Sequence, residues 1–396
     1  MIATARDLDS EVEALLAESV EQAIERERTE FDRRSGPLRD SIVLFGARKL
    51  GRRTLAGLRL AGVEPLAFAD NNPELWGSSI DGIKVFSPAD AANTFGSSAV
   101  FVITIWGRGP HDSMADRQRQ LADLGARCVV PFVPLYWKYA PFLVPHNALD
   151  LPHKVVAHAA EVERCFSIFE DGESRDQFLR QIAWRLTGDF DALSSPVPDE
   201  IYFPREIAFP NGKEVFIDCG AYDGDTLLRF LDRASGAFHK IVAFEPDPAN
   251  LSALDDTLSK LPPDVRDRVT VLPYALGDVE CTVRFCANGT PGSAVGAGDT
   301  EVKCAQLDEV LSGEAPTFIK MDIEAFEPRA LAGAADLIRR CEPVIAACSY
   351  HVQDHVWTIP LLLKQLNPRY AILLRQHIQL VEDLVCYAAP RKRLMC

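Results

Sequence analysis

Residues 216–230 read FIDCGAYDGDTLLRF, and this stretch decides the fold of the second half of the chain. An apolar run typical of a buried strand passes into a run typical of a helix. Gly220 and Gly224 stand between the two runs, where glycine allows backbone angles that other residues rarely adopt. Because ligands of open α/β sheets bind beyond the carboxyl ends of the strands, the turn predicts one wall of a ligand site.

The charge of this turn narrows the class of ligand. A dinucleotide fingerprint needs the spacing G-x-G-x-x-G, so that pyrophosphate can lie against the start of the helix. The turn lacks that spacing, and Asp218, Asp223 and Asp225 would repel a phosphate. Negative charge suits a ligand that carries an ammonium or a sulfonium group, and S-adenosylmethionine carries both. We therefore expect S-adenosylmethionine as the cofactor.

An acidic residue follows the next strand, in the segment IVAFEPDPANL. Glu245 stands 25 residues after Gly220, at the position where a carboxylate can accept both ribose hydroxyls of a nucleoside. The third strand ends in LPYALGD, where backbone groups can meet an adenine edge. The predicted cofactor contacts are Asp218, Gly220, Ala221, Tyr222, Gly224, Thr226, Glu245, Pro246 and Ala275.

The second half of the chain resembles the FkbM family of S-adenosylmethionine-dependent methyltransferases. The matching segments are EVFIDCGAYDGDT, IVAFEPDPANL, YALGD, FIKMDIEAFEPRALAGA and SYHVQDHVWTIP. The resemblance implies a class I methyltransferase fold with a seven-stranded sheet, in which the last strand pair reverses the parallel order. It also implies O-methylation, often of sugar or polyketide hydroxyls.

Acidic residues and a histidine follow the fourth and fifth strands of this domain. Asp322, Glu324 and His351 are the candidate catalytic residues, because a hydroxyl acceptor needs a base that takes its proton. The same three residues could hold a divalent metal, but their spacing is no known metal signature, and we expect no metal site. Tyr350, Asp354 and Trp357 are expected on a loop that contacts the acceptor.

The first half shows its own alternation of strands and helices between Ser41 and Pro134, which predicts a Rossmann-like unit. Gly46, Gly51 and Asp70 stand where a dinucleotide site would need them, but Arg48 replaces the middle glycine. A dinucleotide cofactor and a structural, recognition or dimerisation role both remain open for this unit.

The predicted architecture is α/β, with two doubly wound Rossmann-like domains in tandem. Residues 1–40 are expected to hold an amphipathic N-terminal helix that packs on its own domain or on a second copy of the chain. Residues 41–135 form the accessory unit, and residues 136–200 form an aromatic loop and a helical connector. Residues 201–396 form the methyltransferase domain.

Composition excludes several classes of protein. The net charge of −15 argues against nucleic acid as the main partner, since phosphate backbones require a basic surface. The longest apolar run is too short to cross a membrane, and no secretory signal is visible. The ten cysteines show no CxxC pair, which favours buried free thiols in the cytoplasm.

Three functions remain open from the residues. The first is O-methylation of a hydroxyl on a sugar, a glycan or a related metabolite. The second is an NAD-dependent oxidoreductase of a nucleotide sugar that uses the first unit. The third is a non-catalytic binding protein that keeps a remnant cofactor pocket.

Overall fold

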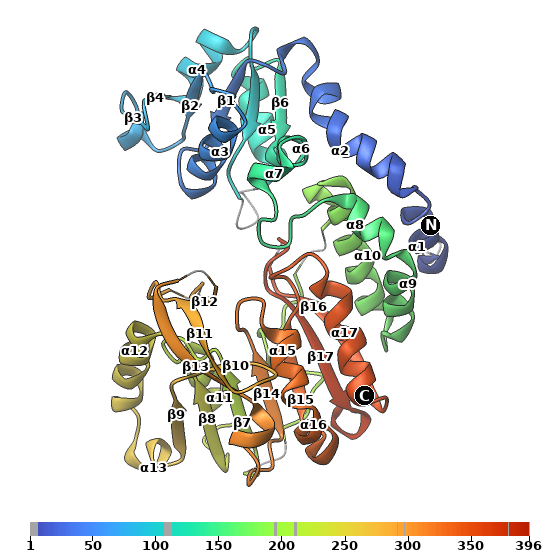
Figure 1. Cartoon of the computed structure of the whole chain (residues 1–396), viewed down its shortest axis with the longest axis vertical. Coiled ribbons are helices and arrows are strands. Elements are labelled where there is room, and N and C mark those ends of the chain that lie inside the picture. Colours follow the sequence, from blue (N-terminus) through green and yellow to red (C-terminus); the bar gives the residue numbers. More distant parts are fainter. Residues whose placement is uncertain are drawn as a thin grey trace. The chain divides into compact units, whose positions relative to one another are not determined.

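The computed structural model describes residues 7–106, 113–193, 196–209, 212–290, 292–296, 298–378 and 380–395. The chain divides into two units, each of which has its own sheet (Figure 1). Unit 1 comprises Met1–Glu163, Leu179–Ser195 and Ile378–Val381. Unit 2 comprises Arg164–Phe178, Pro196–His377 and Glu382–Cys396.

Unit 1 is built on a six-stranded sheet. Its strands are β1 (Ile42–Phe45), β2 (Ala67–Ala69), β3 (Ser79–Ile80), β4 (Ile83–Phe86), β5 (Val100–Ile103) and β6 (Cys128–Pro131). The order is β3-β4-β2-β1-β5-β6, and every pairing except β3 with β4 is parallel. The helices α3 (Lys49–Leu60), α4 (Pro88–Phe95) and α5 (Met114–Asp123) connect the strands. The predicted Rossmann-like unit is confirmed.

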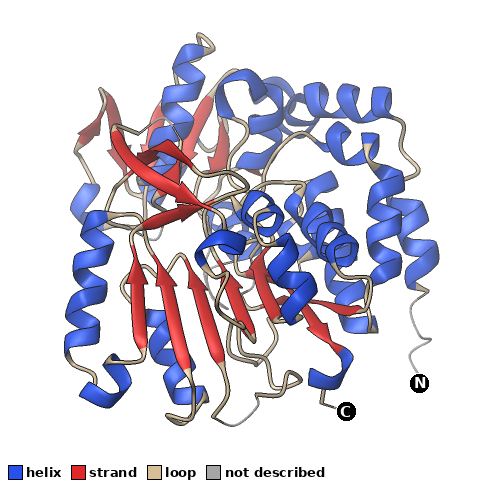
Figure 2. Ribbon diagram, turned by 60° about the horizontal axis from the view of Figure 1, so that its bottom comes forward, coloured by secondary structure: helices blue, strands red, loops and turns tan. Residues whose placement is uncertain are grey.

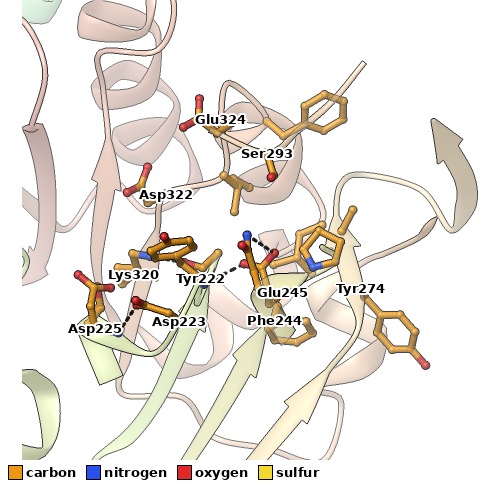
Figure 3. A pocket seen from close by; sticks show the side chains of 18 of the residues that line it. Tyr222, Asp223, Asp225, Phe244, Glu245, Tyr274, Ser293, Lys320, Asp322 and Glu324 are labelled. Atoms are coloured by element: carbon orange, nitrogen blue, oxygen red, sulfur yellow. Dashed lines mark hydrogen bonds between the residues drawn. The ribbon is translucent and has the colours of Figure 1, made fainter. Parts of the chain in front are cut away.

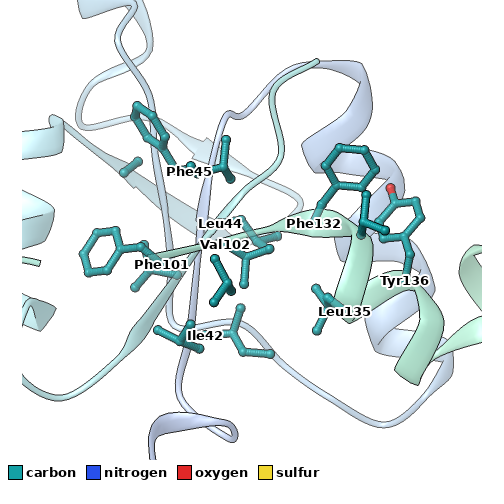
Figure 4. Close-up of a cluster of buried hydrophobic side chains, with 14 of the residues drawn as sticks. Ile42, Leu44, Phe45, Phe101, Val102, Phe132, Leu135 and Tyr136 are labelled. Atoms are coloured by element: carbon teal, nitrogen blue, oxygen red, sulfur yellow. The ribbon is translucent and has the colours of Figure 1, made fainter. Parts of the chain in front are cut away.

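The core of unit 1 forms around β1 and β5, whose residues are all buried. Continuous apolar strands of this kind are typical of a parallel sheet that is covered on both faces. Figure 4 shows side chains of Ile42, Leu44, Phe101 and Val102 with Phe132, Leu135 and Tyr136, which follow β6.

The segment PFVPLYWKYAPFLVP is helical, so the prediction of an aromatic loop is wrong. It forms α6 (Phe132–Lys138) and α7 (Ala140–Leu143). Pro134 falls in the first turn of α6, where a backbone N–H has no partner inside the helix. Proline therefore costs α6 no hydrogen bond, and its aromatic residues are buried in the core.

The predicted N-terminal helix is two helices, α1 (Leu8–Leu15) and α2 (Val20–Ser35). Ser19 starts α2 with a capping box, in which its hydroxyl accepts from the Gln22 N–H at 3.2 Å. Phe31 of α2 is fully buried within the core of unit 1. Lys138 of α6 pairs with Asp32 of α2 at 2.5 Å. The helix α2 therefore packs on its own unit.

Three helices follow in the predicted connector, α8 (Pro152–Ala157), α9 (Ala159–Ile168) and α10 (Gly172–Thr187). The division between the two units falls within α9 and within α10. No helix of the described residues is long and apolar enough to span a membrane.

Unit 2 carries a seven-stranded sheet in the order β16-β17-β15-β14-β7-β8-β9, which confirms the class I fold (Figure 2). Its strands are β7 (Val215–Cys219), β8 (Lys240–Phe244), β9 (Val269–Leu272), β14 (Phe318–Met321), β15 (Val344–Cys348), β16 (Tyr370–Gln376) and β17 (Leu384–Pro390). The expectation that the last strand pair reverses needs correction, because β17 alone runs against the others. Strand β16 is antiparallel to β17 and so has the direction of β15.

The helices of unit 2 connect these strands. They are α11 (Asp225–Arg233), α12 (Pro248–Ser259), α13 (Pro263–Arg266), α14 (Leu307–Val310), α15 (Glu327–Ala332), α16 (Ala335–Cys341) and α17 (His355–Leu366).

A second, four-stranded sheet lies in unit 2, with the order β10-β13-β11-β12. Its strands are β10 (Tyr274–Leu276), β11 (Cys281–Cys286), β12 (Ala294–Val295) and β13 (Thr300–Ala305). Strands β11 and β13 form an antiparallel pair. Pro273 separates β9 from β10, since proline cannot donate to a sheet ladder. The chain thereby passes from β9 in one sheet to β10 in the other.

Candidate active site

A pocket of about 450 Å³ lies at the carboxyl ends of the central strands of unit 2 (Figure 3). The turn after β7, the tip of β8 and the segment after β14 line it, and the second sheet closes it with Phe285, Ser293 and Val295. The volume is that of a site for a small molecule. The pocket sits where the strand order reverses between β7 and β14, as expected for an open α/β sheet.

The turn after β7 requires glycine at its first position. Gly220 has a φ of 84°, and a Cβ built on it would stand 2.0 Å from the carbonyl oxygen of Asp322. A side chain there would force β7 and β14 apart. Gly220, Tyr222 and Thr226 line the pocket, whereas Ala221 and Gly224 support the turn without lining it.

Glu245 closes this turn against the tip of β8. Its Oε2 accepts the N–H of Tyr222 at 2.8 Å, and its Oε1 accepts the N–H of Asp247 at 2.9 Å. Burial raises the pKa of Glu245, against the effect of these hydrogen bonds. Each carboxylate oxygen has two lone pairs, so the pocket-lining carboxylate can accept further hydrogen bonds from a ligand. Pro246 and Ala275 line the pocket beside it.

Asp218 lies beneath the turn and does not line the pocket. Its side chain is fully buried and pairs with Lys320 at 3.1 Å. Lys320 also donates to the carbonyl oxygen of Gly220 at 2.6 Å. Burial opposes the charge of Lys320, but Asp218 and Asp322 raise its pKa. Asp218 therefore supports the turn through Lys320, and its side chain does not reach the pocket, where the sequence analysis predicted a cofactor contact.

Asp322 and His351 belong to a chain of charged groups that continues to Glu327. Nε2 of His351 lies 3.3 Å from Oδ1 of Asp322, and Nδ1 lies 2.9 Å from Oε1 of Glu327. Burial opposes protonation of His351, but Glu327 and Asp322 raise its pKa well above the usual value. Burial likewise opposes ionisation of Asp322, but the bond with His351 and the charge of Lys320 lower its pKa. The histidine is therefore a cation held between two carboxylates.

Tyr202 holds the other oxygen of Asp322. The phenol donates to Oδ2 of Asp322 at 2.8 Å, and Tyr202 lines the pocket. Its φ of 71° is unusual for a residue with a side chain, so this stretch of chain is held in a constrained conformation.

Glu324 is the second predicted catalytic residue that lines the pocket. It stands in a strained turn, with φ values of 52° at Glu324 and 78° at Ala325. Burial raises the pKa of Glu324 to about 7, and the neighbouring charge of His351 only partly opposes this. Its Oε2 lies 3.8 Å from Nε2 of His351. A carboxylate that titrates near neutrality is suited to proton transfer at the working pH.

A metal could be considered at Asp322, Glu327 and His351, whose donor atoms lie within 4.8 Å of one another. The two carboxylates, however, face opposite nitrogens of the imidazole ring. A ligand nitrogen must offer a lone pair to a metal. The ion pairs already account for the positions of all three side chains.

The predicted acceptor residues lie apart from the pocket lining. The ring of Tyr350 packs on His351, with 4.3 Å between centroids. Asp354 is exposed at the start of α17. Trp357 lies inside α17 and is 1% exposed, so the prediction that it lies on a loop is wrong. An apolar helix face buries this residue against the sheet.

Other lining residues escaped the sequence analysis because no motif marks them. Tyr202 comes from a segment that reads as a linker, and Asp383 comes from the turn before β17. Arg229 lines the rim and pairs with Asp225 at 3.7 Å. These residues reach the pocket only because folding brings together segments that are far apart in the sequence.

Comparisons with known proteins agree with this fold. Residues 218–367 match the family described as Methyltransferase FkbM domain. A crystal structure of Methyltransferase FkbM from Methylobacillus flagellatus KT superposes with a TM-score of 0.80 and 19% identity, over 96% of this chain and 99% of that chain. An SAH-bound methyltransferase of Podospora anserina overlaps weakly, with a TM-score of 0.27 and 15% identity, over 59% and 88% of the two chains. The comparison with curated proteins found no match.

Proposed function

Because residues 218–367 match the family described as Methyltransferase FkbM domain, we propose that the chain transfers a methyl group from S-adenosylmethionine to a hydroxyl of a sugar, a glycan or a related metabolite. The observation that carries the proposal is Glu324, a pocket-lining carboxylate whose pKa of about 7 suits a general base.

The pocket residues fit the cofactor. Gly220 has no side chain to cover the backbone of the turn, so a ligand can approach it. A Cβ at this position would also collide with the carbonyl oxygen of Asp322. Glu245 would accept the ribose hydroxyls, and residues 274–276 would meet the adenine. Asp223 and Asp225 line the pocket and would favour the cationic end of the cofactor. When bound, S-adenosylmethionine supplies a methyl group that its sulfonium activates.

The three predicted catalytic residues take different roles in this proposal. Glu324 accepts the proton of the acceptor hydroxyl, since half of it is ionised near neutral pH. His351 is already protonated and cannot accept another proton, and Asp322 is held by His351 and Tyr202. The charged chain therefore fixes the wall of the pocket on which Glu324 stands.

The charges of the pocket favour an acceptor without phosphate. Lys320 is engaged by Asp218, and Arg229 is paired with Asp225. Asp322, Glu324 and Asp383 line the pocket as acids. A neutral hydroxyl compound avoids the repulsion that a phosphorylated acceptor would meet. The described cysteines are all free, which supports a reducing compartment such as the cytoplasm.

Two measurements test the proposal. Calorimetry should show that S-adenosylmethionine and S-adenosylhomocysteine bind to the full chain. NAD should not compete with either ligand for this site. Incubation with methyl-labelled S-adenosylmethionine and fractionated cell extract, followed by mass spectrometry, should place the label on a hydroxyl oxygen. The proposal would be overturned if calorimetry showed no binding of S-adenosylmethionine. It would also be overturned if the label appeared only on carbon or nitrogen atoms of the product.

A further inference from the structure

Unit 1 repeats the backbone arrangement that forms the pocket of unit 2. Gly46 follows β1 as Gly220 follows β7, with φ values of 116° and 84°. A Cβ on Gly46 would lie 2.8 Å from the carbonyl oxygen of Thr104, and one on Gly220 would lie 2.0 Å from that of Asp322. Thr104 and Asp322 each follow the strand on the far side of the switch point.

The acid at the tip of the second strand is also repeated. Oδ2 of Asp70 accepts the N–H of Ala47, which stands 23 residues earlier, at 2.7 Å. Oδ1 of Asp70 accepts the N–H of Asn72 at 2.8 Å. Glu245 makes the same pair of bonds, to an N–H 23 residues earlier and to one two residues later. Asp70 thus occupies the position from which Glu245 would accept ribose hydroxyls.

The glycines of unit 1 serve the roles that a dinucleotide fingerprint assigns to its first and third glycines. Gly46 forms the tight turn, and Gly51 lets α3 approach it, since a Cβ on Gly51 would lie 1.8 Å from the Gly46 carbonyl oxygen. Arg48 replaces the middle glycine, so a guanidinium stands where pyrophosphate would otherwise meet bare backbone.

The charge of the turn is the reverse of that in unit 2. Arg48 and Lys49 are exposed at the start of α3, and neither makes an ion pair or a side-chain hydrogen bond with a described residue. Asp223 and Asp225 occupy the corresponding turn before α11. Two free cations at the start of a helix of 12 residues attract an anion, whereas the aspartates repel one.

A buried donor without a partner lies at the same end of the sheet. The indole Nε1 of Trp106 is buried and has no hydrogen-bond partner among the described residues. Trp106 stands two residues after Thr104, as Glu324 stands two residues after Asp322 in the pocket of unit 2. A buried N–H without a partner is uncommon in a native structure and suits an oxygen of a ligand.

We propose that unit 1 binds a nucleoside diphosphate. Asp70 accepts hydrogen bonds from the ribose hydroxyls, through the lone pairs that its two backbone contacts leave free. Arg48 and Lys49 bind the phosphates at the start of α3. The site is separate from the methyl-transfer pocket, and it does not depend on the function proposed for unit 2.

Calorimetry of the full chain with ADP and with UDP tests the site, in the presence of saturating S-adenosylhomocysteine. Binding of either nucleotide supports the proposal, provided that adenosine and inorganic pyrophosphate each bind at least tenfold more weakly. The 2′-deoxynucleotide should also bind more weakly, because it lacks one hydroxyl for Asp70. Absence of binding by both nucleotides up to about 1 mM would overturn the proposal.

Three variants locate the site. Arg48→Glu should lower nucleotide affinity at least tenfold and leave the melting temperature unchanged, because Arg48 is exposed. Asp70→Asn should remove the preference for the ribose over the deoxyribose nucleotide. Glu245→Gln is the matched control in unit 2 and should leave nucleotide affinity unchanged. If Arg48→Glu keeps the nucleotide affinity of the unsubstituted chain, the nucleotide binds elsewhere and the assignment is refuted. The assignment is also refuted if Glu245→Gln abolishes nucleotide binding.

Discussion

Replacing Glu324 with glutamine removes the proposed base while keeping the size of the side chain. Burial raises the pKa of Glu324 to about 7, so the carboxylate form is the one that accepts a proton. General bases contribute about 10²–10⁴-fold to a rate, and we expect kcat of Glu324→Gln to fall within that range. Affinity for S-adenosylhomocysteine should change less than about threefold, since the proposed cofactor contacts are the turn after β7, Glu245 and residues 274–276.

The dependence of the methyl-transfer rate on pH gives a more specific prediction for Glu324. A group with a pKa of about 7 is about one tenth ionised at pH 6 and about nine tenths ionised at pH 8. The rate should therefore rise about tenfold over this interval and then level off, and activity is lost as the pH falls. The groups that face Glu324 are Asp322, His351, Glu327 and Glu382. The pKa of Asp322 is lowered, against its burial, by His351 and Lys320, and the pKa of His351 is raised, against its burial, by Glu327 and Asp322.

The assay follows labelled methyl transfer to the acceptor between pH 5.5 and 9, under single-turnover conditions that isolate the chemical step. Glu309→Gln is the control, because Glu309 is exposed on α14 and makes the same chemical change outside the pocket. A Glu324→Gln variant that keeps both its rate and the rise near pH 7 would refute the role of Glu324.

Three further substitutions test other parts of the site. Glu245→Ala should weaken binding of both adenosyl ligands by about 1–3 kcal/mol in calorimetry, the usual cost of losing hydrogen bonds to a charged group; unchanged affinity would exclude the ribose contact. Tyr202→Phe removes the bond to Asp322, and single-turnover kinetics should show about a tenfold slower rate with unchanged ligand affinity. Lys320→Met leaves Asp218 buried without its partner, so urea unfolding should show a loss of about 3–5 kcal/mol, which the added substitution Asp218→Leu largely restores.

The fold of unit 2 could be predicted because its signals are local. The strand before Gly220 is apolar except for Asp218, and the turn and Glu245 follow at fixed distances along the chain. The start of α11 follows from the glycine turn and from the aspartate that begins the helix. The register of parallel strands then brings Gly220, Glu245 and Asp322 to one edge without further information.

The rest of the site depends on contacts between segments that no local pattern links. Glu327 begins α15, where a carboxylate commonly stabilises the start of a helix, yet this carboxylate pairs with His351. Tyr202 and Asp322 are 120 residues apart. For Trp357 the sequence predicted a functional contact that the structure does not show. An aromatic residue near carboxylates suggested a sugar contact, but the side chain of Trp357 is buried in the core. Sequence spacing predicts which strand tip carries a side chain, but not which of its neighbours turns toward it.

In the repeated turn of the two units, different residues determine the backbone conformation and the charge that a ligand meets. Glycine at the strand end and an acid at the next strand tip set the backbone, and both units meet these requirements with the same hydrogen bonds. The side chains that follow set the charge of the ligand. At an effective dielectric constant of about 20, two unit charges about 4 Å apart interact by about 4 kcal/mol, close to a thousandfold in affinity. We therefore expect the change of charge from Asp223 to Arg48 to favour an anionic ligand in unit 1 over the cationic ligand proposed for unit 2, without any change in the fold.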